Sequence, residues 1–289
     1  MNKITKKRIF LMIFLCILSC SIGVFAATIY KASDIIYNAS DGTSMNVSEA
    51  LNELYSNSKK EYYVNGLTAY YNPVTGSKCK VSEATANTNS KGTYTEVKTG
   101  CMKWYIFKED MNNYTMILAH NTTARIKWND NNVNVAYSES NVVSEVNKLV
   151  SVSKWKDTPR LITAYELAKI TGNSSFDSSV ESNWYFFDSN GHNQTASSKG
   201  ESSYAWLYDY MYGCASYGCN VEDNNYYTGV GTSGTGYFFG YWTSTTRGTA
   251  SSGYAVWDVY HHGNLDGGDA NYDARGIRPV ITIPKSRLL

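Results

Sequence analysis

The sequence has almost no excess of charge of either sign. Its 26 Lys and Arg residues balance 25 Asp and Glu residues, which leaves a net charge of +1 at pH 7, and only 18% of the residues are charged. A protein that binds nucleic acid needs a basic surface, and one that binds cationic partners needs an acidic surface. The balance of charge argues against both classes, and we expect no nucleic-acid partner.

Several motifs of common enzymes are also absent. The chain contains no H-E-x-x-H, no G-x-S-x-G and no P-loop sequence, and it has only four histidines. These motifs carry metal-dependent hydrolysis, serine hydrolysis and nucleotide binding. The sequence therefore offers no catalytic residue to name, and we expect binding rather than catalysis, without a cofactor.

Aromatic residues, by contrast, are abundant. Tyrosine accounts for 25 of the 289 residues, and aromatics together make up 14%. Tyrosine combined with Asn, Ser, Thr and Gly is typical of exposed β-rich surfaces and of binding loops. The length allows one large domain with appendages and a substantial core.

The N-terminal segment indicates export. Basic residues precede an apolar run over residues 9–25, which ends in a small-residue cleavage pattern at Val24-Phe25-Ala26. These features predict a signal peptide over residues 1–26. Because the apolar run approaches spanning length, an uncleaved membrane anchor is the alternative, and this segment is the one part that we expect to meet a membrane. The protein should be secreted or attached to the cell surface.

The cysteines agree with export. Four remain after residues 1–26 are removed, and an even number in an exported chain predicts two disulfides. Four cysteines allow three pairings, of which we expect the one between sequence neighbours. A lone C-x4-C does not match a zinc pattern, so we expect no metal site. The expected pairs are Cys79 with Cys101 and Cys214 with Cys219.

The periodicity predicts an α+β domain over residues 61–289, preceded by an amphipathic helix or stalk within residues 27–60. Ser44 or Asn46 is available to cap that first helix. Thr163 and Glu166 form a capping box for a second helix, which Gly172 should end. Strands are expected at 67–71, 102–107, 114–119 and 184–187, and further helices at 142–150 and 203–212.

Three runs near the C-terminus predict strands at residues 241–245, 254–259 and 276–283. Residues 260–275, between the last two runs, have almost no apolar filler and predict a long surface loop for recognition. Tyr and His would act as low-entropy anchors there, and Asn and Asp as polar contacts, with residues 223–227 as a neighbouring loop. The candidate ligand-binding residues are Tyr260, His261, His262, Asn264, Asp266, Asp269, Asn271, Tyr272 and Asp273.

Other residues are of types that occur in metal-binding, sugar-binding or catalytic sites, but we expect structural roles for them. His261 and His262 lie near Asp266 and Asp269, but adjacent side chains usually diverge, so we favour polar surface over a metal site. The tryptophans that could stack on sugars are expected in the core, with each indole N–H bonded to backbone. Arg278, next to Pro279, must be paired if buried, and we expect two hydrogen bonds to a loop carbonyl or carboxylate. The tryptophans concerned are Trp206, Trp242 and Trp257.

The closing motifs resemble those of a known superfamily. The runs Y-W-T-S-T at 241–245, A-V-W-D-V at 255–259 and G-I-R-P-V at 276–280 are similar to the C-terminal motif of formylglycine-generating-enzyme-like proteins. They are also similar to exported proteins of gut Firmicutes that end in G-V-R-P-V-I. The resemblance covers residues 64–284 and implies a C-type-lectin-like domain of antiparallel strands, two to three helices and long loops, on the surface of a Gram-positive bacterium.

The resemblance implies the fold more clearly than the chemistry. Enzymes of that superfamily carry a copper-handling cysteine pair between the Trp-containing strand and the final Arg-Pro strand, whereas this chain has no cysteine after Cys219. The variable proteins of diversity-generating retroelements place a hypervariable loop there, and every residue type in 260–275 can arise from an altered Asn codon. We therefore expect a binding protein for an unknown protein or glycan ligand. The alternatives are a formylglycine-generating type of oxidoreductase and a structural subunit of a surface appendage.

Overall fold

The computed structural model describes residues 36–38, 44–58, 60–84, 98–122, 125–173, 175–179, 184–186, 203–219, 238–248 and 254–289. The chain divides into two compact units, Met1–Asn57 and Ser58–Leu289. The predicted signal peptide and the loop at 223–227 lie outside the described residues. Among the residues described, no helix has both the length and the apolar character needed to cross a membrane.

The first unit holds a short strand pair followed by a helix. Strand β1 (Ile36–Asn38) pairs antiparallel with β2 (Ser44–Asn46), and α2 (Val47–Ser58) begins directly after it. The Asn46 side chain accepts a hydrogen bond from the Glu49 amide at 2.8 Å, and the Glu49 carboxylate accepts one from the Asn46 amide at 2.9 Å. This reciprocal cap confirms the predicted helix and selects Asn46 as its cap.

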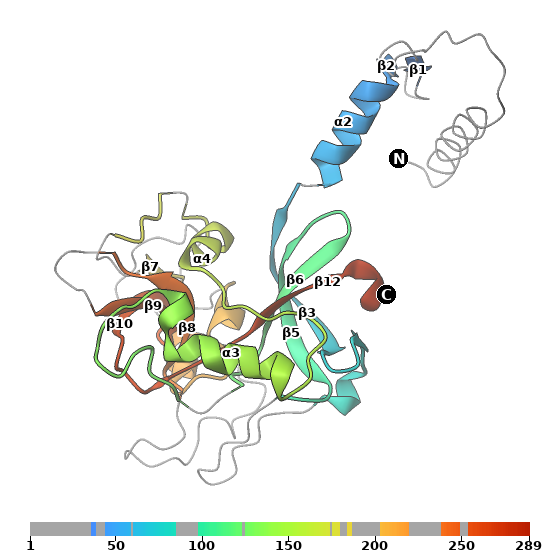
Figure 1. The fold of residues 1–289 in the computed structure, drawn as a ribbon. Coiled ribbons are helices and arrows are strands. Elements are labelled where there is room, and N and C mark those ends of the chain that lie inside the picture. Colours follow the sequence, from blue (N-terminus) through green and yellow to red (C-terminus); the bar gives the residue numbers. More distant parts are fainter. Residues whose placement is uncertain are drawn as a thin grey trace. The chain divides into compact units, whose positions relative to one another are not determined.

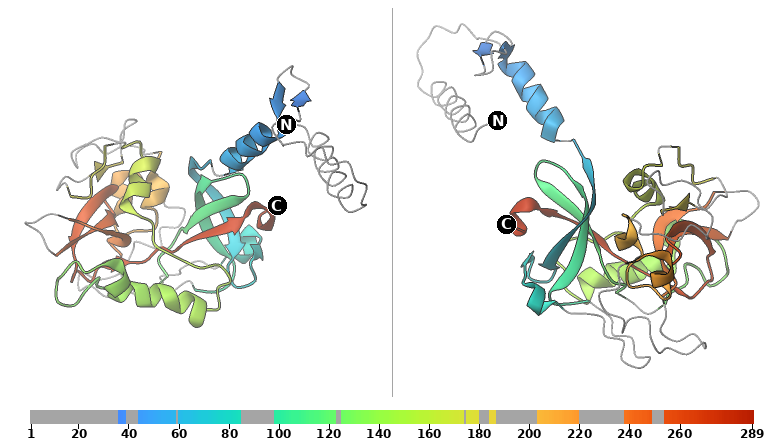
Figure 2. Two further views of the ribbon diagram at one scale, coloured as in Figure 1. Left: turned by 45° about the horizontal axis from the view of Figure 1, so that its top comes forward. Right: turned by 180° about the vertical axis from the view of Figure 1, so that it is seen from behind.

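The described strands of the second unit form two five-stranded sheets, in the orders β12-β6-β5-β3-β4 and β11-β8-β9-β10-β7 (Figures 1 and 2). We call them the β5 sheet and the β9 sheet. All neighbouring strands are antiparallel except β11 and β8, which are parallel. The predicted α+β class is thus confirmed, with mostly antiparallel sheets and few helices. The strands of the β5 sheet are β3 (Tyr62–Asn72), β4 (Ser77–Lys78), β5 (Met102–Glu109), β6 (Asn113–Leu118) and β12 (Val280–Pro284). Those of the β9 sheet are β7 (Trp184–Tyr185), β8 (Gly240–Thr246), β9 (Ala255–Tyr260), β10 (Asn264–Asp269) and β11 (Arg275–Gly276).

The hairpin of β5 and β6 is the best-predicted part of the fold. Asp110 fixes its turn by accepting hydrogen bonds from the Asn112 and Asn113 amides, both at 2.7 Å. Both faces of β5 are buried: Tyr105 packs in the cluster shared with the β9 sheet, and Trp104 packs on the opposite face. A strand covered on both sides reads as a continuous apolar run, which is why sequence alone could place it.

Two α-helices cover the sheets. Helix α3 (Asn141–Ser151) packs Val142 and Val146 against residues of the β9 sheet and Leu149 into a cluster of the β5 sheet, so it spans both (Figure 1). Helix α4 (Ala164–Ile170) carries the predicted capping box, with 3.0 Å hydrogen bonds in both directions between Thr163 and Glu166. Short 3-10 turns occur at Val81–Glu83, Tyr137–Glu139, Ala205–Leu207, Cys214–Tyr217 and Lys285–Arg287.

The C-terminal segment joins the two sheets. The strand predicted over 276–283 is in fact two strands, β11 and β12, separated by Ile277, Arg278 and Pro279. Proline has no backbone N–H to donate to a ladder, which favours the break at this point. The Arg278 side chain is fully buried and donates to two carbonyls, those of Leu207 at 3.2 Å and Asp209. The expected pairing of Arg278 with loop carbonyls is therefore present.

Two further expectations about the fold were wrong. Residues 203–212 do not form a helix, because Trp206, Leu207 and Tyr208 are all buried in succession and Tyr210 has a positive φ of 60°. An exposed α-helix would bury only one stripe of its residues. Residues 260–275 are not one long loop, since β10 occupies Asn264–Asp269 within them.

The disulfides and tryptophans largely follow expectation. The bonds Cys79–Cys101 and Cys214–Cys219 are both present. Trp242 and Trp257 are fully buried, and their indole N–H groups donate to the carbonyls of Ile126 at 2.7 Å and Ser178 at 3.1 Å. Trp206 is also buried, but its N–H donates to the Asn65 side chain at 2.7 Å rather than to backbone.

Candidate binding surface around Arg275

A buried arginine organises the polar end of the β9 sheet. Arg275 in β11 lies beside Gly240 in β8, and its side chain is only 4% exposed. A Cβ at Gly240 would lie 2.4 Å from the Val259 carbonyl oxygen and 2.8 Å from Arg275 Cδ, so this crowded position beside the arginine side chain requires glycine. The backbone thus fixes where the guanidinium sits.

Arg275 pairs with a fully buried carboxylate. Its Nε lies 2.8 Å from Oδ2 of Asp258, which faces Asp266 across the β9–β10 ladder. Burial raises the pKa of Asp258 to about 7, with Asp266 adding to the rise and Arg275 opposing it. An ionised carboxylate without water is costly, and one cation compensates that cost only in part.

Two tyrosine rings enclose the same guanidinium. The ring centres of Tyr260 and Tyr272 each lie 4.7 Å from the Arg275 guanidinium carbon. Such cation–π contacts are worth about 0.5 to 2 kcal/mol each, more when desolvated. Burial raises the pKa of Tyr260, whereas Tyr272 keeps 42% of its surface exposed. Tyr272 is thus an exposed aromatic ring held on a buried charge.

Residues 269–273 form a tied turn that carries Tyr272 outward. The Tyr272 amide donates to the Asp269 carbonyl at 2.8 Å, and the Asn271 amide donates to the Asn132 side chain at 3.2 Å. Arg125 makes an ion pair with Asp273 at 3.3 Å. Asp269, Asn271, Tyr272 and Asp273 are all exposed. These bonds hold a polar rim around the Tyr272 ring.

The histidine pair borders this group through Tyr260, whose ring centre lies 4.3 Å from that of His261 and 4.5 Å from that of His262. His261 and His262 make the tight connection between β9 and β10, where Gly263 has a φ of +71°. His262 stacks on Tyr217 at 4.2 Å, beside the Cys214–Cys219 disulfide. Burial, and to a smaller extent the charge of the neighbouring His262, lower the pKa of His261 to about 3. Only 7% of the residue is exposed.

The predicted residues therefore divide into groups. Tyr260, Asp266 and Tyr272 share the surroundings of Arg275, and Asp269, Asn271 and Asp273 lie on the adjacent turn. His261 and His262 have ring centres 4.2 Å apart and so do not diverge as expected, and His261 is not polar surface. Asn264 is 1% exposed and cannot reach a ligand in solution without rearrangement.

Sequence reasoning missed Asp258 and Arg275, which position the tyrosines. A detectable signal was present, because Asp258 is a lone charge in the apolar run A-V-W-D-V, as Arg278 is in its own strand. A charge inside a buried strand requires a partner. The sequence did not indicate that this partner would be Arg275, since β11 and β8 meet only in the folded sheet.

Among the residues described, no group of three or more His, Cys, Asp or Glu side chains could hold a metal ion. Comparisons of the chain with models of protein families, with curated proteins and with solved structures found no match. Function must accordingly be argued from the geometry above.

Proposed function

We propose that this chain is an exported binding protein, and that it recognises a protein or glycan ligand with the surface formed by Tyr260, Asp266, Tyr272 and the 269–273 turn. The observation that carries the proposal is the placement of Tyr272. The residue is 42% exposed, and yet its ring is stacked on Arg275, which is itself paired with Asp258. A rigid exposed aromatic ring with a polar rim is the usual anchor of a binding surface.

Preorganisation favours binding at this position. A side chain that is ordered before the ligand arrives loses less entropy on association, and tyrosine has only two side-chain torsions to fix. Three strands and the turn restrain the Tyr260–Arg275–Tyr272 stack through the β9 sheet. The surface requires no rearrangement to present its aromatic group.

The disulfides support the exported location. Both bonds close within the second unit, Cys79–Cys101 across 22 residues and Cys214–Cys219 across 5. Disulfides persist outside the cytoplasm and are rare within it. Together with the predicted signal peptide, they favour a secreted protein or one attached to the cell surface.

We also propose that the second unit is a C-type-lectin-like domain of the formylglycine-generating-enzyme-like type. The antiparallel sheets, the buried Trp242 and Trp257 and the buried Arg278 of the closing motif support this assignment. An experimental structure tests this assignment. Strand connectivity like that of a C-type-lectin-like domain would support it, and a different connectivity would overturn it.

The binding proposal is tested with the full chain on glycan and protein arrays. We expect Tyr272→Ala to weaken binding of any captured ligand by tenfold or more, the loss of a central aromatic anchor. Tyr62→Ala is the matched control, because Tyr62 is 49% exposed and lies in β3 of the β5 sheet.

Equal affinity in the two variants would place the binding surface elsewhere. A copper titration separates binding from the enzymatic alternative. Stoichiometric copper binding by the reduced chain that depends on the thiols of Cys214 and Cys219 would favour an oxidoreductase instead.

A further inference from the structure

A pocket of about 350 Å³ lies in another part of the second unit and shares no lining residue with the surface around Arg275. Its volume lies at the lower end of the range for small-molecule sites. It opens between strand β3 and the start of α4. The lining residues are Tyr63, Arg160, Thr163, Tyr165, Glu166 and Lys169.

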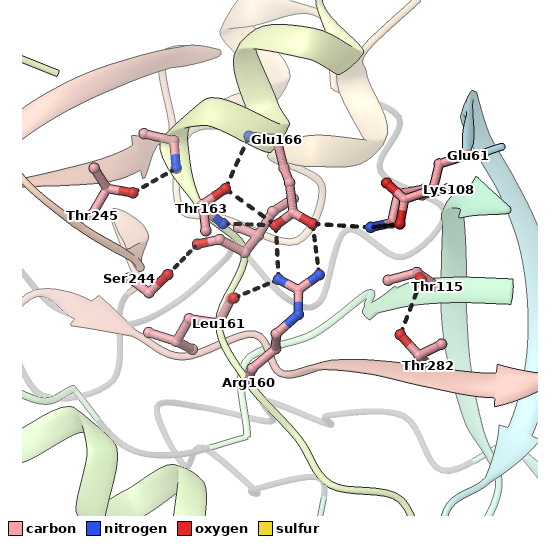
Figure 3. A network of polar contacts seen from close by, with 12 residues as sticks. Glu61, Lys108, Thr115, Arg160, Leu161, Thr163, Glu166, Ser244, Thr245 and Thr282 are labelled. Atoms are coloured by element: carbon pink, nitrogen blue, oxygen red, sulfur yellow. Dashed lines mark hydrogen bonds and ion pairs between the residues drawn. The ribbon is translucent and has the colours of Figure 1, made fainter. Parts of the chain in front are cut away.

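The pocket has a fixed arginine in its wall. Arg160 donates from both terminal nitrogens to the Glu166 carboxylate, at 2.6 and 2.7 Å, and also to the Leu161 carbonyl at 2.9 Å (Figure 3). Lys108 lies on the other side of the carboxylate, 3.8 Å away. This two-point pairing orients the guanidinium, while 39% of the Arg160 side chain stays exposed.

Glu166 is occupied by these partners. Burial opposes its ionisation, but the hydrogen bonds and charge of Arg160, the Thr163 amide and Lys108 outweigh burial and lower the pKa of Glu166. The carboxylate is thus ionised and already paired at neutral pH. It holds the wall in place and does not offer a free negative charge to the pocket.

Lys169 supplies a second positive charge that the wall does not neutralise. It is exposed, its ammonium lies 5.8 Å above the Tyr63 ring, and it makes no ion pair with any residue that the structure describes. The lining therefore carries two cations and one carboxylate, and that carboxylate is committed to Arg160. A pocket with this balance attracts an anion.

The remaining walls are aromatic and hydroxylated. Tyr165 is held by an edge-on contact with Phe176 at 5.1 Å and by a 2.9 Å hydrogen bond with Ser178, and it is 47% exposed. Tyr63 also lines the pocket, with the Lys169 ammonium over the face of its ring. Flat faces with hydroxyl edges suit a ring that bears hydroxyl groups.

We propose that this pocket binds an acidic sugar, with the carboxylate of the sugar on Lys169 and the exposed edge of Arg160, and with the ring between Tyr63 and Tyr165. This site is independent of the surface around Tyr272. A failure of one proposal therefore leaves the other standing.

The test titrates the full chain with glucuronate, glucose and benzoate by ligand-observed NMR. Glucuronate should bind, glucose should bind at least about tenfold more weakly because it lacks the charge, and benzoate should bind more weakly than glucuronate. Lys169→Met, which keeps the aliphatic stem, should raise the Kd for glucuronate about tenfold, and Lys169→Arg should restore most of it.

Lys127→Met is the matched control, because it removes a partly exposed lysine that lies outside the pocket. It should leave glucuronate binding unchanged, as Tyr272→Ala should. The proposal is overturned if the wild-type chain does not bind glucuronate, if glucose binds equally well, or if Lys169→Met behaves like Lys127→Met. Tighter binding of benzoate than of glucuronate would reject the sugar.

Discussion

Two buried residues in or next to strand β9, Asp258 and His261, have pKa values shifted in opposite directions. Asp258 has its pKa raised from 3.8 to about 7, so it holds a proton in the folded state over a range where the unfolded chain has released it. His261 has its pKa lowered from 6.5 to about 3, so it stays neutral where the unfolded chain would bind a proton. In both, burial favours the uncharged form.

These shifts predict opposing effects of pH on stability. The contribution of Asp258 is full below about pH 4 and is lost as the pH rises through 7, whereas that of His261 is full above about pH 6.5 and is lost as the pH falls toward 3. Relative to wild type, Asp258→Asn should therefore become less destabilising between pH 4 and 7. His261→Gln should become more destabilising as the pH rises from 4 to 6.5.

Denaturant unfolding at several pH values measures both slopes, each expected to be on the order of 2 kcal/mol or more across its range. Asp269→Asn is the control, because it removes a carboxylate that is exposed rather than buried. Slopes of the same sign in the Asp258 and His261 variants would contradict the assignment.

At the scale of elements, strand β10 shows where sequence reasoning reached its limit. The run N-L-D-G-G-D has the composition of a loop, yet it pairs with β9 along its whole length. Added Cβ atoms would lie 2.0 Å from Arg247 Nη1 at Gly267 and 2.3 Å from Asp258 Oδ2 at Gly268. The glycines make room for charged side chains from elsewhere in the chain, and no local pattern carries that information.

We expect Gly268→Ala to destabilise the protein by about 1 to 3 kcal/mol, the usual cost of overpacking. The neighbouring Asp258 side chain is buried and paired with Arg275, so it cannot move aside cheaply. Thermal unfolding should show a loss of several degrees. Gly248→Ala serves as the control, since a Cβ there would meet no atom of the described residues within 4 Å, and an equal loss in both variants would argue against the steric cause.

The elements that sequence did predict share a local origin. The cap at Thr163 and Glu166, the turn at Asp110 and the neighbouring cysteine pairs each depend on residues close together in the chain. Part of the candidate site could be predicted for the same reason, because Tyr260 and Tyr272 lie in one polar stretch of the sequence. Their support by Arg275 across β8 depends on tertiary pairing and could not be named.

On the scale of the whole second unit, the chain between β11 and β12 links the two sheets through a buried segment that contains Leu207 and Asp209. Arg278 donates to the carbonyls of Leu207 and Asp209 and lies 4.7 Å from the Tyr241 ring in the β9 sheet. Tyr105 in the β5 sheet donates to the Asp209 carboxylate at 2.7 Å. One buried network therefore contacts both sheets, and its loss should affect them together.

We accordingly predict that Arg278→Met destabilises the unit by about 3 kcal/mol or more, because it removes two hydrogen bonds from buried carbonyls and a cation from an aromatic face. Tryptophan fluorescence and far-UV circular dichroism should shift to the same lower denaturant midpoint, since the arginine links both sheets. Arg125→Met is the matched control: it removes the ion pair with the exposed Asp273, which is worth at most about 1 kcal/mol. If the two variants were equally stable, or if only one probe shifted, Arg278 would not be the link between the sheets.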